Sequence, residues 1–531
     1  LLSGKFLYVC TEATEIATIC GEKIYRFVNF ECIPYSLTLE KHRLNSREWK
    51  DERIYLDMMK MIFLRGNFLF SYGHNITNSY QRISVIENDP EQSALPLWKK
   101  ADERFFWNRY LLRDFINAGA SEWIVPLMDG FVSSQTSIQN GRRFTFTFIS
   151  RRSCQRVGTR FTCRGLDSEG YAANFVETEQ IISPESTLQI LSFVMTRGSV
   201  PILWEQPPTL KWMPPITIFS PKKAAIAFRN HFSDQIRLYG RQIAVNLINH
   251  KGGELTLEKS YQSLVDEFNN RQLRYVSFDF HRECKALRWD KLSLLTDEVR
   301  SEFDDMGWFV GSENLDSSWE ISRTQRAVFR VNCLDNLDRS NVVQSLFARE
   351  ILRKQFDSLE IPSEPFSPGF EKVFKNIWAD NADAMSLQYA GTKALKTDYT
   401  RTGKRTVIGA LNDGYNSLQR YVLNNFHDGT TQDAYNVFLG QYVPHRGDTS
   451  PFSTGHSRRS IRSTLLKFFL AFATAISAVS LSLPQIFPFS VTRISVASLV
   501  LLFVTTRVYI MPHGKVYTSI PKTVSDLQAV D

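Results

Sequence analysis

The chain has 531 residues, of which 43% are hydrophobic and 22% are charged, and this composition excludes a disordered protein. At this length we expect about two to four structural units, with enough sequence to bury a core. The net charge of +8, from 63 basic and 55 acidic residues, favours anionic partners only mildly and is too small to indicate a nucleic-acid-binding protein.

The cysteines bear on the cellular compartment. Their number is seven, and they are scattered without the spacing of a disulfide framework, so we expect a reducing, cytosolic environment. No C-x-x-C pair is present, and His281 with Cys284 lacks a second pair of ligands, which argues against a zinc site. The sequence begins at Leu1 rather than at Met, so we expect a short N-terminal piece to precede it. No signal peptide is visible in the given sequence.

The first 140 residues contain short runs typical of β-strands, including KFLYVC, KIYRFVNFECI and FLFSY. From residue 141 to residue 444, strand-like runs such as GRRFTFTFISRRS, TRFTCRGLDSEGYAANFVETEQI, RQIAVNLINHK and LRYVSFDFH occur with the helical patterns of KKAAIAFRNHFSDQIRLYG and NLDRSNVVQSLFAREILRKQF. We therefore expect a β-rich or α+β domain over 1–140, followed by an α/β domain over 141–444.

Two apolar stretches near the end of the chain have the length of membrane spans. Residues 468–487 carry no charge, and about 20 residues at 1.5 Å each reach roughly 30 Å, the hydrocarbon thickness of a bilayer. Residues 489–511 are also apolar, with Arg493 and Arg507 near the two ends, where long side chains reach the headgroups. We expect two transmembrane helices within 464–511; the alternative is a buried helical hairpin of a soluble domain.

The segments around these stretches predict their orientation. Residues 445–463, rich in Ser, Gly, Pro and charge, predict a flexible linker, and residues 512–531 a tail. Basic residues flank the pair of spans on both outer sides and only one lies near the turn, so the positive-inside rule predicts that the N-terminal part and the tail face the cytosol. The glycosylation sequon Asn75-Ile76-Thr77 would then be a chance match on the wrong side of the membrane.

The stretch FRVNCLDNLDRSNVVQS, residues 329–345, places Cys333 six positions before Arg339. We expect a strand that ends at the cysteine and a helix that begins just after the arginine. The backbone N–H groups and the dipole at such a helix N-terminus favour a bound phosphate and stabilise a thiolate. Arg339 can bind two phosphoryl oxygens as a fork, and Ser340 can cap the helix or donate a hydrogen bond to the thiolate.

This arrangement predicts cleavage of phosphate esters. Cys333 would attack phosphorus while an acid protonates the leaving alcohol, and water activated by the same acid would then hydrolyse the phosphocysteine. Asp335 and Asp338 are both candidates for that acid, and the sequence does not choose between them; we expect at least one to be structural. The chemistry needs no metal and no organic cofactor. A C-x5-R spacing alone arises often by chance, and the flanking strand and helix and the Asp-x-x-Asp give it weight.

The segment RVNCLDNLDRSN resembles the signature R-x-N-C-x-D-C-x-D-R-T-N of the Sac-domain phosphoinositide phosphatases, and segments such as SFVMTRGSVPILWEQ and WADNADAMSLQYAGTKALKTDYTRTGKRT are also similar to this family. The resemblance implies that Cys333 and Arg339 are the catalytic cysteine and arginine, with Asp335 and Asp338 as the motif aspartates. The members with two C-terminal spans are enzymes of the endoplasmic reticulum and Golgi that mainly hydrolyse phosphatidylinositol 4-phosphate. The resemblance therefore also implies protein adaptors at the Golgi or at membrane contact sites as candidate partners.

Two positions depart from the family pattern. Asn336 stands in place of the second motif cysteine and Ser340 in place of the threonine, and neither change removes the nucleophile or the phosphate fork. We expect Asn336, Ser340 and Asn341 to bind substrate. A basic segment could draw an anionic membrane surface to the site, although a solvated charged loop is the alternative. Its five cations are Lys393, Lys396, Arg401, Lys404 and Arg405.

We therefore expect a membrane-anchored phosphoinositide phosphatase that faces the cytosol, with an N-terminal α+β domain packed on an α/β catalytic domain and a two-helix anchor. Two alternative enzymes are a relative that acts on the 3,5-bisphosphate and a protein tyrosine phosphatase. An alternative from another class is a catalytically weak membrane scaffold that binds phosphoinositides.

Overall fold

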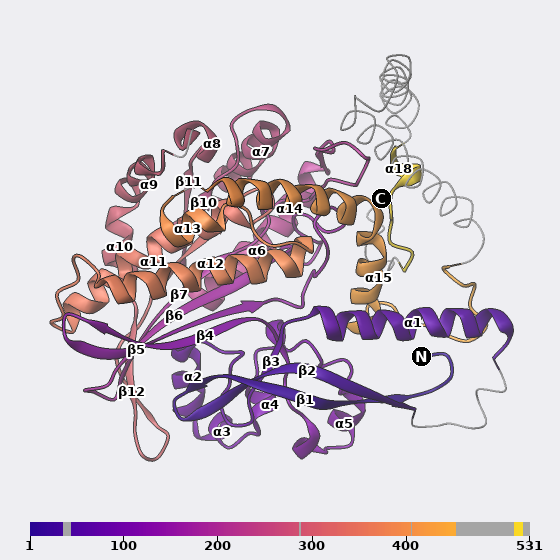
Figure 1. Cartoon of the computed structure of the whole chain (residues 1–531), viewed down its shortest axis with the longest axis horizontal. Helices are drawn as coiled ribbons and strands as arrows, with labels where there is room; N and C mark the ends of the chain where they lie inside the picture. Colours follow the sequence, from indigo (N-terminus) through magenta and orange to yellow (C-terminus); the bar gives the residue numbers. More distant parts are fainter. Residues whose placement is uncertain (35–43, 286–287, 405, 453–513, 524–531) are drawn as a thin grey trace, which may run out of the picture.

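The computed structural model describes residues 1–34, 44–285, 288–404, 406–452 and 514–523 (Figure 1). A twelve-stranded sheet runs through the molecule, and a separate two-stranded sheet pairs β8 (Trp204–Glu205) with β9 (Thr217–Ile218). The first seven strands of the large sheet are antiparallel neighbours in chain order. They are β1 (Phe6–Ile19), β2 (Glu22–Pro34), β3 (Phe68–Phe70), β4 (Met128–Gln139), β5 (Arg142–Arg152), β6 (Val176–Pro184) and β7 (Gln189–Arg197).

The hairpin of β4 and β5 carries the sheet from the N-terminal region into the rest of the chain. Its two turn residues, Asn140 and Gly141, have φ values of 48° and 79°, as a type I′ turn requires. The expected domain boundary near residue 141 falls in this turn, so the two strands on either side of the boundary form one continuous hairpin.

The second half of the large sheet is mostly parallel. From β7 the order continues through β14 (Ala327–Asn332), β10 (Arg241–Asn246) and β11 (Leu273–Ser277), all parallel, while β12 (Phe309–Glu313) joins β7 antiparallel and pairs with β13 (Trp319–Arg323). The helix α7 (Gly252–Phe268) connects β10 to β11. Strands that alternate with helices here confirm the α/β prediction.

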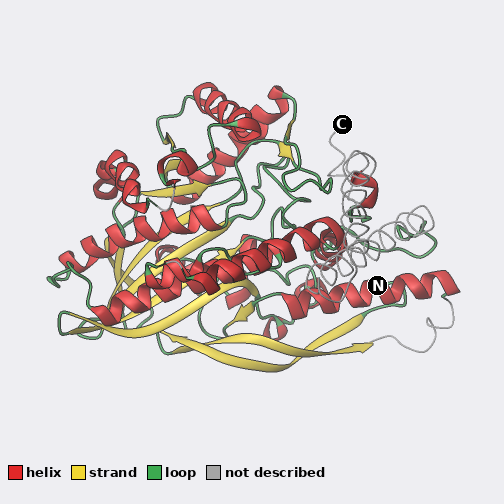
Figure 2. Cartoon of the chain, turned by 45° about the horizontal axis from the view of Figure 1, so that its top comes forward, coloured by secondary structure: helices red, strands yellow, loops and turns green. Residues whose placement is uncertain are grey.

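Helices cover both faces of this half of the sheet, and Figure 2 shows a layer of helices above the long curved strands. Along β7, Ile190 and Val194 pack with α6 (Pro221–Tyr239) and α7, whereas Leu191 and Phe193 pack with the helices of the opposite face. Side chains of a strand alternate between the two faces, so both faces are apolar in the buried strands. The opposite face is covered by α9 (Leu292–Glu298), α10 (Arg300–Met306), α11 (Asp338–Ser358) and α12 (Pro368–Ala390).

The last helices return to the N-terminal region. After α13 (Thr397–Thr402) and α14 (Val407–Phe426), the helix α15 (Asp428–Phe438) packs against α1 (Ser46–Arg65), with Phe438 edge-on to Phe63. Phe452 packs edge-on against Tyr55, so the first residues of the expected linker lie on the N-terminal domain. The remaining short helices are α2 (Tyr80–Glu87), α3 (Pro90–Ser93), α4 (Leu97–Lys100), α5 (Arg113–Asn117), α8 (Phe280–Glu283) and α18 (Gly514–Tyr517).

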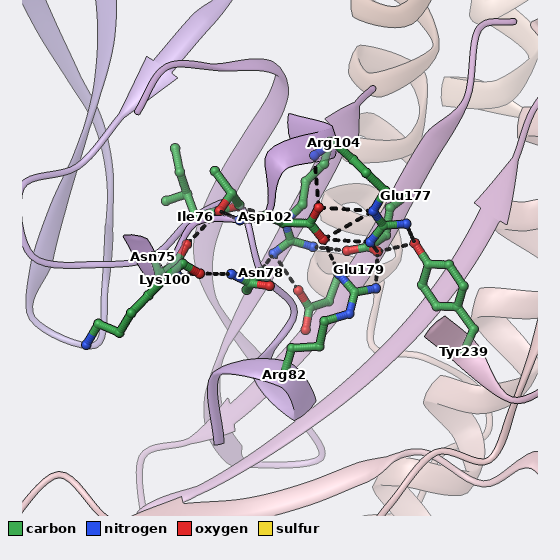
Figure 3. Close-up of polar contacts among 12 residues, drawn as sticks. Asn75, Ile76, Asn78, Arg82, Lys100, Asp102, Arg104, Glu177, Glu179 and Tyr239 are labelled. Carbon is green, nitrogen blue, oxygen red and sulfur yellow. Dashed lines mark hydrogen bonds and ion pairs between the residues drawn. The ribbon is translucent and has the colours of Figure 1, made fainter. Parts of the chain in front are cut away.

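A buried ionic network connects α2 of the N-terminal region to strands β5 and β6 of the sheet (Figure 3). Glu177 on β6 accepts hydrogen bonds from Arg151 at 3.0 Å, from Arg82 at 2.7 Å and from the hydroxyl of Tyr239. Glu179 accepts from Arg151 at 2.7 Å, and the side chains of Arg151 and both glutamates are fully buried. Each buried charge therefore depends on its partners for compensation.

The sequon Asn75-Ile76-Thr77 lies in the same seam. Arg151 Nε donates to the carbonyl of Ile76 at 2.7 Å, and Asn75 Nδ2 donates to the carbonyl of Lys100 at 3.0 Å. The hydroxyl of Thr77 donates to Asn75 Oδ1 at 2.7 Å, and both side chains are buried. The Asn75 amide is thus part of the core and has no room for a glycan.

Two further expectations concern particular segments. Residues 159–164, expected to begin a strand, form a loop, because Thr159 and Thr162 hydrogen-bond each other and Gln432 instead of a neighbouring strand. Among the described helices, none is long and apolar enough to cross a membrane. The two expected spans, 468–487 and 489–511, lie outside the described residues.

Candidate active site

The candidate catalytic loop lies at the carboxyl edge of the parallel strands. Asn332 ends β14 opposite Asn246, the last residue of β10, and Val331 is paired with Arg197, the last residue of β7. Cys333 follows directly and is 2% exposed. Ligands of open α/β sheets bind at this edge of the strands, so the position of the loop suits a binding site.

The helix after the loop starts earlier than the sequence predicts. α11 begins at Asp338, so Asp338 and Arg339 belong to its first turn, and the residue before it, Leu337, makes no side-chain cap. The expectation that Ser340 caps the helix is therefore wrong, because Ser340 already lies inside the helix. Its hydroxyl is buried and has no hydrogen-bond partner among the described residues, which leaves it able to bind a group in the loop.

Asp335 is held by two arginines that come from far along the chain. Arg160 binds it with two hydrogen bonds, at 3.0 Å and 2.7 Å, and Arg164 adds a third at 2.8 Å. Burial alone would raise the pKa of Asp335, but the two guanidinium groups outweigh burial and hold its pKa well below the ordinary value. Asp335 is therefore ionised at neutral pH and has no proton to donate.

Arg164 also fixes the backbone of the loop. Its Nη1 donates to the carbonyl of Leu334 at 3.0 Å, and its Nη2 donates to Gln206 at 2.7 Å in addition to Asp335. The sequence analysis assigns neither Arg160 nor Arg164 to the site, because it places them in an expected strand. The signal available for them is two arginines four residues apart in TRFTCRG.

Asp338 is in a different environment. Its Oδ1 accepts the backbone N–H of Leu395 at 3.0 Å, from the segment that leads into α13, while its Oδ2 makes no hydrogen bond to a described residue. The side chain is partly exposed. No arginine forms an ion pair with Asp338 in the described part of the chain, so this carboxylate is available for proton transfer in a way that Asp335 is not.

Asn336 and Asn341 hydrogen-bond neighbouring segments through their side-chain amides, while Oδ1 of Asn336 is buried without a hydrogen-bond partner among the described residues. Asn336 has a φ of 55°, in the left-handed region that asparagine tolerates better than most residues, and its Nδ2 donates to the carbonyl of Asn174 at 3.0 Å. Asn341 donates to the carbonyl of Trp378 at 3.0 Å and accepts from Asn381 at 3.1 Å, which links α11 to α12.

Arg339 reaches from the first turn of α11 to the segment after β10. Its Nη1 donates to the carbonyl of Leu247 at 2.9 Å and lies 3.4 Å from Oε2 of Glu254, whereas Nε and Nη2 make no hydrogen bond to a described residue. Burial would lower the pKa of Arg339, but the nearby Cys333, Glu254 and Asp335 raise it. One edge of the guanidinium is thus anchored, and the other edge can bind an oxyanion.

Arg197 is a cation that the sequence analysis missed. Its side chain is fully buried, and none of its three guanidinium nitrogens has a hydrogen-bond partner among the described residues. Burial lowers its pKa to about 10, against the charges of Cys333 and Asp338, so it remains protonated at neutral pH. Its only sequence signal is a charged residue at the end of the apolar run SFVMTR.

The basic segment divides into paired and unpaired side chains. Arg401 forms ion pairs with Asp380 at 2.8 Å and with Asp383 at 3.6 Å. Lys393, Lys396 and Lys404 are exposed and form no ion pair with a described residue, and Arg405 lies outside the described residues. Among the described residues no group of three or more His, Cys, Asp or Glu side chains could hold a metal ion.

Comparisons with known proteins point to a single family. The SacI homology domain matches residues 1–285. The chain is 44% identical over 469 residues to the phosphatidylinositol-3-phosphatase SAC1 of Drosophila melanogaster, covering 86% of this chain and 77% of the relative. It is 36% identical over 501 residues to the protein of that name in Saccharomyces cerevisiae, covering 91% and 77%, and 36% identical over 449 residues to the phosphoinositide phosphatase SAC7 of Arabidopsis thaliana, covering 83% and 73%. The chain therefore belongs to the Sac-domain phosphoinositide phosphatase family.

Proposed function

We propose that this protein hydrolyses a phosphomonoester of phosphatidylinositol phosphates through a phosphocysteine intermediate on Cys333. The observation that carries the proposal is the convergence of positive charge on this cysteine. The N-terminus of α11, the half-anchored Arg339 and the unpartnered Arg197 all surround it. A thiolate and a phosphoryl group are the two anions that such a site stabilises. The names of the relatives, as phosphoinositide phosphatases, support the same activity.

In the first step the Cys333 thiolate attacks phosphorus, the sulfur–phosphorus bond forms and the bond from phosphorus to the inositol oxygen breaks. Arg339 binds phosphoryl oxygens through its free edge, and Ser340 donates its unpartnered hydroxyl to the same group or to the sulfur. Asp338 gives its proton to the leaving inositol oxygen, since Asp335 is kept ionised by its two arginines.

In the second step water attacks the phosphocysteine. Asp338, now a carboxylate, takes the proton of the attacking water, the sulfur–phosphorus bond breaks, and phosphate leaves with the thiolate restored. The proton returned to Asp338 makes it an acid again for the next turnover. Residues 141–444 supply all of these groups and form the proposed catalytic domain, with 1–140 as the N-terminal subdomain.

For the substrate we propose chiefly phosphatidylinositol 4-phosphate, converted to phosphatidylinositol. This preference rests on the resemblance to the family members with two C-terminal spans, because nothing in the loop discriminates between phosphate positions. Relatives in Drosophila melanogaster and Saccharomyces cerevisiae carry the name of a 3-phosphatase. The 3-phosphate is therefore the principal rival substrate.

We also propose that residues 464–511 anchor the protein in the endoplasmic reticulum and Golgi membrane with two spans, the catalytic domain and the tail facing the cytosol. Contacts of the segment after the anchor support this orientation. Ser519 N donates to the carbonyl of Asn425 at 2.7 Å, and the backbone N–H of Thr523 donates to Asp433 at 2.7 Å. A tail that packs on the catalytic domain requires an even number of crossings.

The test is phosphate release by the purified full chain from short-chain phosphatidylinositol 3-, 4- and 5-phosphate and from the 3,5-bisphosphate, with Cys333→Ser as the control. We expect fastest release from the 4-phosphate and none from the Ser variant. Fastest release from the 3-phosphate would replace the proposed substrate. Release from no isomer would leave a phosphoinositide-binding scaffold, and equal release by the Ser variant would remove Cys333 from the mechanism.

A further inference from the structure

The helix α14, which Figure 1 labels, exposes an apolar face to solvent. From Ile408 onward the exposed apolar residues follow a spacing of three and four, which places them on one side of the helix. The exposed fractions are Val407 79%, Ile408 72%, Leu411 70%, Tyr415 68%, Leu418 61% and Val422 39%. We refer to these six residues as the α14 face.

The buried side of α14 is polar, the reverse of an ordinary surface helix. Its buried residues are Arg420, Asn424 and Asn425. Arg420 Nη2 donates to the hydroxyl of Ser386 and to the carbonyl of Lys393, both at 3.0 Å. A water-exposed helix normally turns its apolar stripe inward, so this arrangement indicates that the α14 face does not meet water in the working protein.

An aromatic loop extends the apolar surface. Trp212 stacks on Tyr421 of α14, with ring centroids 5.6 Å apart and planes 12° apart, and remains 61% exposed. Its neighbour Met213 is 51% exposed, and the Tyr421 hydroxyl fixes the loop by donating to the carbonyl of Leu210 at 2.7 Å. Exposed tryptophan beside aliphatic residues is typical of surfaces at the membrane interface.

The charge around the α14 face favours an anionic partner. The exposed lysines 393, 396 and 404 precede the helix without an ion pair to a described residue, and Lys211 is exposed next to Trp212. On α14, Asp413 faces these lysines, but its carboxylate accepts the backbone N–H of Lys396 at 3.1 Å. An apolar face beside unpaired lysines has the composition of a helix that lies in an anionic lipid surface.

The same helix is connected to the candidate catalytic loop. Asn424 Oδ1 accepts from Arg160 at 3.3 Å, and Arg160 in turn binds Asp335. At the other end, the segment before α13 donates the N–H of Leu395 to Asp338. The buried side of α14 therefore contacts Arg160, which holds the loop that carries both aspartates.

We infer that the α14 face, with Trp212 and Met213, inserts into the headgroup region of an anionic bilayer and docks the catalytic domain on the membrane that holds its substrate. The occupant is the lipid surface; a second copy of this chain or another of its own segments is the competing occupant. Docking itself is measured without any substrate. Only the activity test of this inference rests on the proposed function.

Docking is tested on the full chain reconstituted in vesicles of phosphatidylcholine and phosphatidylserine. A bimane label is attached to Leu411→Cys in a background in which Cys10, Cys20, Cys32, Cys154 and the proposed nucleophile Cys333 are replaced by serine, since the Cys333 thiolate would also react with the label. There are two controls. One is the same background with Leu411 unchanged, and the other carries Leu315→Cys at an exposed apolar position in the β12–β13 hairpin. We expect a blue-shifted emission at position 411 that is quenched by nitroxide-labelled lipids, and neither effect at position 315.

Each other outcome overturns the inference. An unshifted emission at position 411 means that water covers the α14 face. A blue shift without quenching by nitroxide lipids means that protein, either a second copy or another segment of this chain, covers it.

The activity test uses Leu411→Ser/Leu418→Ser. We expect an unchanged rate on a monomeric short-chain substrate, which shows that the variant folds, and about a tenfold lower kcat/KM on substrate in vesicles, from the loss of apolar burial. Equal loss on both substrates, or no loss on vesicles, contradicts docking through this face. Release from neither substrate by the unmodified chain contradicts the proposed function alone, because the label then still reports docking.

Discussion

Arg160 Nη2 lies 2.7 Å from Oδ2 of Asp335, although the two residues are 175 positions apart in the chain. This contact, together with that of Arg164, determines the chemistry of the loop. It keeps one of the two motif aspartates permanently charged and fixes the loop between β14 and α11. In the proposed mechanism the proton transfer is thereby left to Asp338, the other aspartate.

The first prediction compares Asp338→Asn with Asp335→Asn. Loss of the general acid lowers kcat by about 10²- to 10⁴-fold, and the loss grows as the pKa of the leaving alcohol rises. We expect this dependence on the leaving group for Asp338→Asn only. Asp335→Asn should lower activity equally for good and poor leaving groups, because it loosens the loop. The reverse pattern in a series of aryl and alkyl phosphates would assign the acid to Asp335.

The second prediction concerns Arg197 as a positioning residue for the thiolate. In Arg197→Met the buried positive charge beside Cys333 is lost while the volume is roughly kept. We expect iodoacetamide to alkylate Cys333 more slowly at neutral pH, with the pH profile of alkylation moved to higher pH, and Arg197→Lys to restore part of the rate. The thermal midpoint of each variant is the control for folding. An unchanged alkylation profile in the Met variant would show that Arg197 is only structural.

Only part of the surroundings of Asp335, Asp338 and Arg197 could be predicted from the sequence. The strand before Cys333 and the helix after it were predictable, because their apolar periodicity is local. The contacts of Arg160 and Arg164 with Asp335 and the position of Arg197 near Cys333 were not, since no pattern in the chain indicates which arginine lies beside the loop across a distance of more than a hundred residues. The Ser340 cap failed for a local reason: the helix starts at Asp338, two positions before Ser340.

The third prediction concerns the buried network at the seam with the N-terminal region. Arg151→Met leaves Glu177 and Glu179 buried without their shared partner, and removing one member of a buried ion pair costs about 3–5 kcal/mol of unfolding free energy. The matched control is Arg143→Met, on the same strand but exposed and 3.6 Å from Glu185, for which we expect a change of about 1 kcal/mol or less. Chemical denaturation of both variants measures the difference. Equal effects would contradict the network's role.

The fourth prediction is a pH dependence of stability at Asp428, the first residue of α15. Burial raises its pKa to about 6, from an ordinary 3.8, so its charged form is the costly one in the folded protein. A group with a raised folded pKa contributes stability below the unfolded pKa and loses it as the pH rises to the folded value.

Asp428→Asn should therefore be more stable than the unmodified chain at pH 7, by about 3 kcal/mol at most, and the advantage should shrink between pH 6 and pH 4. Unfolding free energies of the two proteins at pH 4, 6 and 7 provide the comparison. A constant difference across this range would show that the carboxyl of Asp428 does not titrate there.

The central claim, a phosphocysteine on Cys333, is tested most directly by trapping it. The full chain is mixed with phosphatidylinositol 4-phosphate that carries a radioactive 4-phosphate, quenched in acid within one turnover, digested and mapped by mass spectrometry. We predict label on the peptide that contains Cys333, and none in Cys333→Ser. Label on another residue, or release of phosphate at the normal rate by Cys333→Ser, would contradict the account.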